Sequence, residues 1–121
     1  MEQAKIDGKT KDQDFSTITT LLNQLQHYKG KRYGNAWCRH GEFISIFSNL
    51  DRKFDRLTNI ILQAIHENAP IPEPESEETI METVGDLATY AILWMTFIKQ
   101  NRPKEYEAWE SRIKQYASLN N

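Results

Sequence analysis

Apolar residues recur at helical spacing along this chain, and glycine- or proline-containing segments separate the stretches. The clearest stretch covers about 42–67, where large apolar residues alternate in steps of four and three, as on one face of a helix. Its seam consists of Phe43, Phe47, Leu50, Phe54, Leu57, Ile61 and Ala64. A shorter stretch over 15–29 has the same period and precedes Gly30, which predicts a helix that ends there.

Two more helices are predicted in the second half of the chain. The acidic linker NAPIPEPE cannot be helical through its prolines, and Ser76 is placed to cap a helix over about 77–101. Pro103 suits the first turn of a fourth helix that runs to about 117, with its apolar side facing inward. That side consists of Tyr106, Trp109, Ile113 and Tyr116.

Four helices with short joins predict an all-α fold, a four-helix bundle with antiparallel neighbours. Residues 1–13 are polar without periodicity and are predicted to form a disordered tail, which leaves 14–121 as a single helical domain. The segment LATYAILWMTFI in the third helix is apolar nearly all round. Such a helix is buried on every side, either centrally or in an interface, so we expect a homo-oligomer.

Composition restricts the functional classes. The net charge of −2 provides no basic field for binding a nucleic-acid polymer without sequence specificity. Cys38 is the only cysteine, so no intrachain disulfide can form and a reducing cytoplasm is expected. No run of 18 apolar residues is present, which predicts that the protein does not span a membrane.

Three carboxylates of the third helix follow one another at intervals of four residues. Glu78, Glu82 and Asp86 therefore point to roughly one side, and the same stripe continues into Tyr90 and Leu93. An acidic stripe that turns apolar within one turn indicates a partly buried cleft, where three acids repel one another. Mg²⁺ or Mn²⁺ would relieve this repulsion, and so would Lys and Arg residues from a neighbouring helix.

The second helix provides both kinds of charge. Asp51 flanks the apolar seam and could complete a metal site, whereas Asp55 lies further toward solvent. Arg52, Lys53 and Arg56 could pair with the acids of the third helix or hold phosphates that a metal bridges. The sequence leaves a structural lattice of ion pairs and a ligand site both open.

The connector between the first two helices contains aromatic residues beside glycines. Tyr33 and Trp37, within the segment YGNAW, could stack on a base or ribose, and His40 is a third candidate for this contact. Packing against the end of a bundle is the alternative role for Trp37. No Cys/His spacing suggests zinc, and no phosphate-binding glycine loop is present.

Taken together, YGNAW, NLDRKFDRL and ETIMETVGDLATYAIL resemble the MazG-like all-α nucleoside triphosphate pyrophosphatases, in particular small phage-type members associated with nucleotide modification. The resemblance spans about residues 32–98. It implies an oligomeric bundle, usually a dimer or tetramer, that holds Mg²⁺ between acids of two helices. Such enzymes cleave a nucleoside triphosphate to a monophosphate and pyrophosphate.

The resemblance also implies residue roles. Glu78, Glu82 and Asp86 would be metal ligands, with Glu82 and Asp86 assigned to catalysis and Asp51 or Asp55 on the opposite side. Lys53 and Arg56, with Arg52 beside them, would contact phosphates, and Trp37 or Tyr33 would face the base.

The chain departs from the family in one respect. Better-known members carry a Glu-Glu-x-x-Glu run on the earlier helix, whereas this chain has Glu42, then Asp51 and Asp55 among basic residues. Two nucleotide functions are therefore expected, beside a structural or interaction bundle that binds no ligand and whose acids and bases only pair. The first is a Mg²⁺-dependent nucleotide pyrophosphohydrolase in the cytoplasm, which is the host cytoplasm if a phage encodes the protein. The alternative is a non-catalytic nucleotide-binding protein of the same fold, such as a phage sponge for a cyclic nucleotide immune signal.

Overall fold

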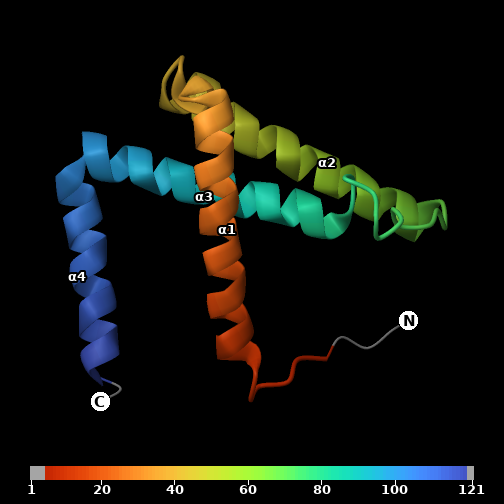
Figure 1. Cartoon of the computed structure of the whole chain (residues 1–121), viewed down its shortest axis with the longest axis horizontal. Helices are drawn as coiled ribbons and strands as arrows, with labels where there is room; N and C mark the ends of the chain where they lie inside the picture. The colour runs from red at the N-terminus through yellow and green to blue at the C-terminus, as the bar shows by residue number, and fades with distance from the viewer. Residues whose placement is uncertain (1–4, 120–121) are drawn as a thin grey trace. The chain divides into compact units, whose positions relative to one another are not determined.

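The computed structural model describes residues 5–119, and this part of the chain is helical without a strand (Figure 1). The all-α fold class predicted from the sequence is confirmed for these residues. The elements in chain order are α1 (Lys11–Tyr33), the short 3-10 turn η1 (Ala36–Cys38), the π-helical turn η2 (Glu42–Ile46), α2 (Phe47–His66), α3 (Ile80–Asn101) and α4 (Pro103–Leu119).

The chain forms two compact units, and the division falls after Ala36. The first unit contains α1, and the second contains α2, α3 and α4. Helix α1 begins at Lys11, inside the stretch predicted as a tail, and residues 1–4 of that stretch lie outside the described residues.

Helix α1 continues one turn beyond its predicted end. Gly30 lies inside the helix, and Gly34 ends it with a φ of 61° and a backbone N–H that donates to the Gly30 carbonyl at 3.0 Å. The prediction chose the wrong glycine because a helix tolerates an internal glycine at a cost of only about 1 kcal/mol. A positive φ, by contrast, favours glycine strongly, and it occurs at Gly34.

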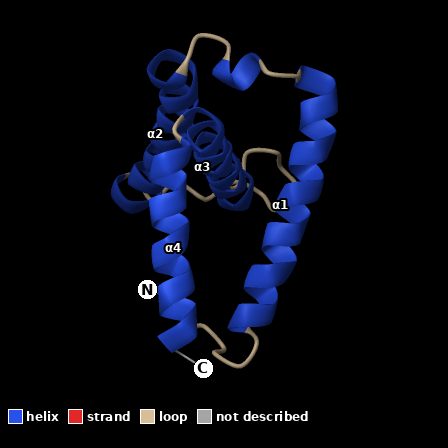
Figure 2. Cartoon of the chain, turned by 90° about the vertical axis from the view of Figure 1, so that its left-hand side faces the viewer, coloured by secondary structure: helices blue, strands red, loops and turns tan. Residues whose placement is uncertain are grey.

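Helices α2 and α3 lie side by side and contain the core of the second unit (Figures 1 and 2). Its buried apolar side chains are Ile46, at the end of η2, and Leu93 of α3. Thr83 and Thr89 are also buried, and their hydroxyls donate to carbonyls four residues earlier, those of Thr79 and Gly85. The apolar seam predicted for α2 is divided. Its half-buried members are Leu50, Leu57 and Ala64, whereas Phe43, Phe47, Phe54 and Ile61 are exposed.

The start of α3 differs from the prediction. Thr79 rather than Ser76 caps this helix, because its side-chain oxygen accepts from the Glu82 backbone N–H at 3.0 Å. Ser76 accepts in the same way from the Glu78 N–H at 2.9 Å, so it caps the turn that precedes the helix. Thr79 thereby satisfies a backbone donor that the start of α3 leaves unpaired, whereas the Ser76 contact lies in the turn before the helix.

Helix α4 begins at Pro103 as predicted, but its apolar side is not inward. It leaves α3 at a steep angle in both views and does not run alongside the α2–α3 pair (Figures 1 and 2). Trp109, Ile113 and Tyr116 are consequently exposed, and Tyr106 is half-buried. The antiparallel packing expected of a bundle is therefore limited, in this unit, to α2 and α3.

The apolar second half of α3 is not covered on every side in a single chain. Leu93 is buried, but Ile92 and Met95 are exposed. Despite this apolar segment, none of the described helices combines the length and hydropathy that a membrane crossing requires.

Candidate functional site

Two ion pairs, one from α2 to α3 and one from α2 to the turn before α3, bring together residues that the sequence analysis had singled out. Lys53 Nζ lies 2.9 Å from Asp86 Oδ2, and Arg56 Nη2 lies 3.5 Å from Glu78 Oε1. We call these four residues the charged seam. The Lys53 and Asp86 side chains are only 14% and 18% exposed, so this pair lies largely out of solvent. Arg56 and Glu78 are more exposed and form the outer part of the seam.

Helical geometry explains why these residues meet. Lys53 and Arg56 are three residues apart on α2 and share one side of that helix. Glu78 lies in the turn before Thr79, the N-cap of α3, so the helical spacing predicted for Glu78, Glu82 and Asp86 holds only for Glu82 and Asp86. Side chains of α2 on the same side, such as Leu50 and Leu57, are half-buried toward α3. The apolar contact between the two helices therefore fixes the positions from which the charges pair.

The structure does not bring Asp51 and Asp55 to this seam. Each is two residues from Lys53, and two residues on a helix are about 160° apart around its axis. Both aspartates are accordingly exposed while Lys53 is half-buried. Arg52 is exposed as well, and its Nη2 lies 3.4 Å from Asn49 Oδ1. The side of α2 that faces α3 thus presents cations rather than carboxylates.

The carboxylates of α3 are hard oxygen donors of the kind that Mg²⁺ and Mn²⁺ prefer. Glu82 lies on the same side of α3 as Asp86, one turn earlier, and is exposed. Within residues 5–119, however, no three His, Cys, Asp or Glu side chains are grouped closely enough to hold a metal ion. The donors have the right chemistry, but Asp86 and Glu78 pair with Lys53 and Arg56, and Glu82 is exposed.

A second charged cluster, around Glu42, was not predicted from the sequence. Arg102 Nη1 and Nη2 donate to the two Glu42 carboxylate oxygens at 2.7 and 2.8 Å, and Trp94 Nε1 donates to Oε2 at 2.6 Å. Arg102 Nε also donates to Glu105 at 2.7 Å. Hydrogen bonds from Arg102, and next from Trp94, lower the Glu42 pKa from 4.5 to about 2, while Glu42 raises the pKa of Arg102.

Local backbone structure places Glu42 for this role. Gly41 has a φ of 91°, which favours glycine, and Glu42 opens the π-helical turn that follows. Arg102 is the last residue before α4. The cluster therefore ties the start of η2 to the join between α3 and α4, and Glu42 is not an acid available to a metal at the charged seam.

We expect Glu42→Gln to lower the melting temperature at pH 7. The variant should also lack the loss of stability that protonation of Glu42 causes in the wild type at low pH. A carboxylate with a lowered folded-state pKa contributes stability above its ordinary pKa of 4.5 and loses it as the pH falls toward about 2. Circular dichroism melts between pH 7 and pH 2 would measure this. Glu107→Gln, an exposed change on α4, is the control and should follow the wild type. Identical acid profiles for Glu42→Gln and wild type would contradict the assignment.

The three candidates for contact with a base lie close together in sequence, but Tyr33 belongs to the first unit and Trp37 and His40 to the second. Tyr33 is exposed at the end of α1, in the first unit, with the Arg32 guanidinium 5.8 Å from its ring centre. Trp37 is half-buried in η1. The His40 side chain is exposed, and its backbone N–H donates to Ser45 Oγ at 2.8 Å. A role of these residues in base binding stays a prediction.

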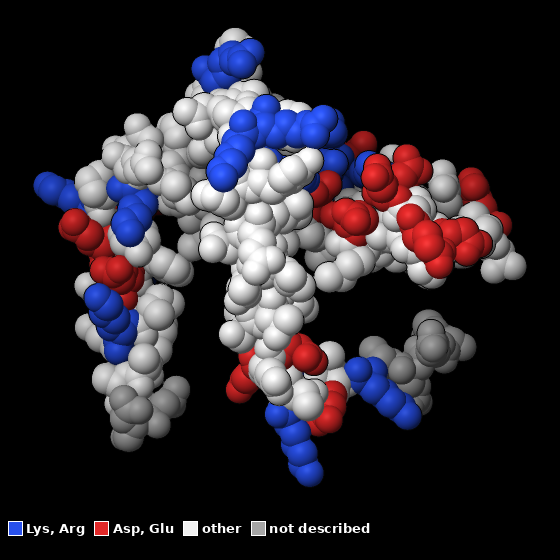
Figure 3. Space-filling view, in the orientation of Figure 1, with Lys and Arg blue, Asp and Glu red and all other residues white. Residues whose placement is uncertain are grey.

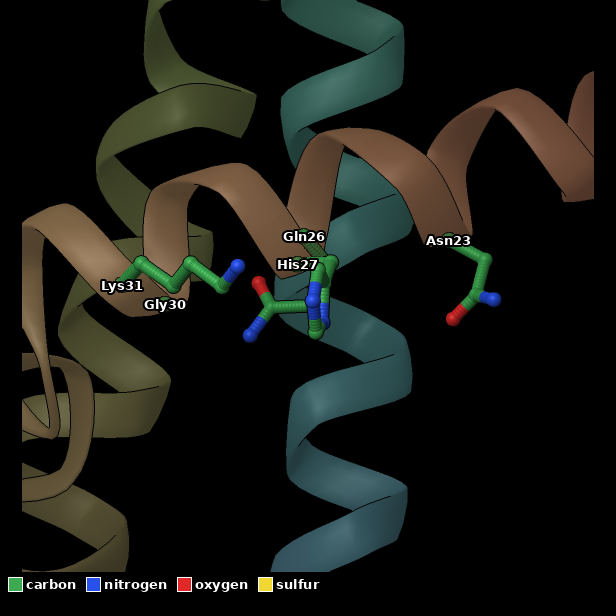
Figure 4. Close-up of a pocket in the computed structure, with 5 residues that line it drawn as sticks. All are labelled: Asn23, Gln26, His27, Gly30 and Lys31. Atoms are coloured by element: carbon green, nitrogen blue, oxygen red, sulfur yellow. The ribbon is translucent and has the colours of Figure 1, made fainter.

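A hollow of about 320 Å³ lies on the surface of α1 (Figure 4). It is lined by Asn23, Gln26, His27, Gly30 and Lys31, and Gly30 leaves space where another residue would place a side chain. None of the predicted site residues lines it. Because its walls are side chains of a single surface helix, it has neither the enclosure nor the apolar lining of a ligand pocket.

Acidic side chains gather where α2 ends and α3 begins (Figure 3). This end carries the linker with Glu73 and Glu75, both exposed. The charged seam lies along the same helix pair, with Glu78 close to the linker in sequence. Lys53 and Arg56 of the charged seam therefore place positive charge next to a largely acidic surface.

Comparison with known proteins finds a relative in a bacteriophage. The chain is 36% identical over 114 residues to the Gene 30 protein of Bacillus phage SP01. The match covers 82% of this chain and 51% of the relative, so the chain spans about half the length of that protein. No protein-family model matches the chain, and no solved structure matches it.

Proposed function

We propose that this chain is a Mg²⁺-dependent nucleotide pyrophosphohydrolase of MazG-like type. It would cleave a (deoxy)nucleoside triphosphate to the monophosphate and pyrophosphate, with the charged seam as its polyphosphate site. The observation that supports this most is the pairing of Lys53 with Asp86 in a largely solvent-excluded position. Cations for phosphate and carboxylates for a divalent metal are the two kinds of group this chemistry needs, and both occur along one helix pair.

The cations would hold the polyphosphate. Arg56 can donate two parallel hydrogen bonds to phosphate oxygens, whereas Lys53 acts as a compact point charge. A phosphate that arrives at Lys53 competes with Asp86 for the ammonium group. Phosphate binding would therefore release the Asp86 carboxylate from Lys53, at the same time as the phosphate brings further negative charge to the seam.

The acids would act on the reaction itself. Glu82 and Asp86, one turn apart on α3, with Glu78 in the turn before the helix, would hold the Mg²⁺ and orient the attacking water. Bound Mg²⁺ would supply charge neutralisation and a more acidic water. In the overall reaction, water adds to a phosphorus atom, the bond to the bridging oxygen breaks, and pyrophosphate leaves. The substrate is a solute of the cytoplasm, which we propose as the place of action.

A second function is favoured by a separate observation. The side of α2 that faces α3 presents Lys53 and Arg56, while Asp51 and Asp55 are turned away from it. Such a site has fewer acids than a two-helix metal site and could retain an anionic nucleotide without hydrolysing it. The chain would then be a nucleotide-binding protein, such as a phage sponge for a cyclic nucleotide.

A thermal-shift panel of nucleoside triphosphates and cyclic nucleotides, with and without Mg²⁺, tests both functions. A ligand present at 100 times its dissociation constant stabilises the folded protein by about 2.7 kcal/mol, which is readily measured. We expect a triphosphate to raise the melting temperature and to be recovered as monophosphate when Mg²⁺ is present. Arg56→Gln should reduce the shift, and Lys104→Gln, an exposed change on α4, should not.

The alternative outcomes are distinct. A ligand that stabilises the protein and is recovered intact with Mg²⁺ would exclude hydrolysis and support the binding protein. If no nucleotide changes the melting temperature, both proposals fail and the charged seam is a structural pair of salt bridges.

A further inference from the structure

One carboxylate of the charged seam is already neutralised by a cation of the protein itself. Lys53 Nζ lies 2.9 Å from Asp86 Oδ2, which is a charge-assisted contact, and both side chains lie largely out of solvent. Water and salt therefore screen this pair less than an exposed one. Asp86 is also a carboxylate that the proposed function assigns to the metal, so Lys53 and a divalent ion compete for the same group.

The remaining carboxylates are divided in the same way. Glu78, in the turn before α3, pairs with Arg56 at 3.5 Å, and Glu82 is exposed one turn before Asp86. Mg²⁺ requires oxygen ligands in near-ideal octahedral geometry at about 2.1 Å, so a carboxylate that a lysine or arginine holds is a poor ligand. The seam therefore has the oxygen donors for a divalent ion, but its own cations hold two of them.

We propose that Lys53 takes the place of the divalent ion at Asp86 until a polyphosphate binds, so that the protein binds its metal only together with the polyphosphate. A polyphosphate offers several anionic oxygens to Lys53 and Arg56 and weakens their hold on Asp86 and Glu78. It also brings oxygen ligands of its own, and Mg²⁺ is commonly bound by one or two protein carboxylates plus phosphates. Metal and polyphosphate would then each raise the affinity of the protein for the other.

This inference rests on the proposed function, because the charged seam is its polyphosphate site. It adds an order of events that a preformed metal site would not have. Carboxylates that face one another without cations would bind a divalent ion with no other ligand present. A seam whose carboxylates are held by Lys53 and Arg56 should bind the ion weakly until the anion arrives.

The size of the effect follows from the charge of Lys53. An adjacent cation weakens the binding of a proton to a carboxylate about ten- to thousandfold. A divalent ion carries twice the charge of a proton, so the ammonium group repels it at least as strongly at the same distance. Removing this charge should raise the affinity of the seam for a divalent ion at least about tenfold, even without phosphate.

Equilibrium dialysis of the chain against Mn²⁺, without phosphate, measures this affinity directly. We expect Lys53→Met and Lys53→Gln to bind Mn²⁺ at least about tenfold more tightly than the wild type. Glutamine keeps a hydrogen-bond donor for Asp86, so Lys53→Gln decides if the methionine variant does not fold. Lys104→Met, which removes an exposed lysine of α4, has the same net charge and should bind Mn²⁺ as weakly as the wild type. Adding Asp86→Asn to Lys53→Gln should abolish the gain.

The same dialysis with inorganic tripolyphosphate on both sides of the membrane tests the coupling. Because the free anion and its Mn²⁺ complexes equilibrate across the membrane, excess Mn²⁺ on the protein side is bound to the protein. We expect this excess for the wild type only when tripolyphosphate is present. Lys53→Gln should instead bind Mn²⁺ in both conditions.

A wild type that binds Mn²⁺ without phosphate as tightly as the Lys53 variants would overturn the inference, since the metal site would then be preformed. Unchanged Mn²⁺ affinity in both Lys53 variants, or an equal gain in Lys104→Met, would overturn it as well. These results leave the proposed function standing if a nucleotide is still bound and converted. If neither nucleotides nor tripolyphosphate bind, the proposed function fails and the inference fails with it.

Discussion

Asp86→Asn is expected to reduce the rate of triphosphate hydrolysis at least about a hundredfold. Removal of a group that stabilises charge in a transition state typically costs this much in enzymes. Asparagine keeps the shape of the side chain and one carbonyl oxygen, but it has no negative charge. It can neither balance Lys53 at 2.9 Å nor serve as a charged ligand for a divalent metal. Pyrophosphate release in the presence of Mg²⁺, measured at saturating triphosphate, would give the change in turnover.

Nucleotide binding by the same variant controls for a damaged site, because both proposed functions expect it to be retained. On the hydrolase reading, Asp86→Asn still binds the triphosphate, because Lys53 is freed from its carboxylate partner. Glu107→Gln, an exposed change on α4, should retain wild-type turnover and controls for a general effect of losing one acid. Turnover within about threefold of wild type in Asp86→Asn would rule out this carboxylate as a catalytic group, since acid–base and charge-stabilising residues contribute far more than that.

Lys53→Met is expected to lower the free energy of unfolding by about 3 kcal/mol, the low end of the cost of removing one partner of a buried ion pair. Methionine retains the apolar stem of lysine, so the loss reports on the charge. The Asp86 carboxylate, only 18% exposed, would remain in a poorly solvated position without its 2.9 Å partner. Urea unfolding followed by circular dichroism would measure the change.

A double-mutant cycle identifies the source of this loss. Because each single variant already removes the same 2.9 Å contact, Lys53→Met combined with Asp86→Asn should be less destabilised than the sum of the two single variants. An additive double variant would show that the two residues do not interact energetically. Arg56→Met, which removes the more exposed cation at 3.5 Å from Glu78, is the comparison and should cost within about 1 kcal/mol.

The helical fold could be predicted from the sequence because helix formation depends on local periodicity. The steps of four and three residues after Phe43 placed a helix over 42–67, and the structure has η2 and α2 over Glu42–His66. Pro103 marked the start of α4 because its fixed φ suits a first turn. Helix ends were harder to predict. Gly30 against Gly34, and Ser76 against Thr79, are near-equivalent local signals, and the observed backbone conformation selects between them.

The candidate site was partly predictable for the same reason. The interval of four residues between Glu82 and Asp86 places both on one side of α3 whatever that helix packs against. Whether they would face a metal or cations was left open, because it depends on which side of α2 lies opposite. The packing of Leu50 and Leu57 toward α3 places Lys53 at Asp86 and turns Asp51 and Asp55 away.

The sequence by itself determined that the described part of the chain is helical, roughly where its helices lie, and that Glu82 and Asp86 share a side of α3. Only the tertiary structure decided that Glu42 pairs with Arg102, sixty positions away, and that Lys53 of α2 pairs with Asp86 of α3. The difference has a physical cause. Helix periodicity and capping depend on residues within about four positions of one another. Ion pairs between helices and the choice of a packing partner depend on how distant segments meet, which the local pattern does not encode.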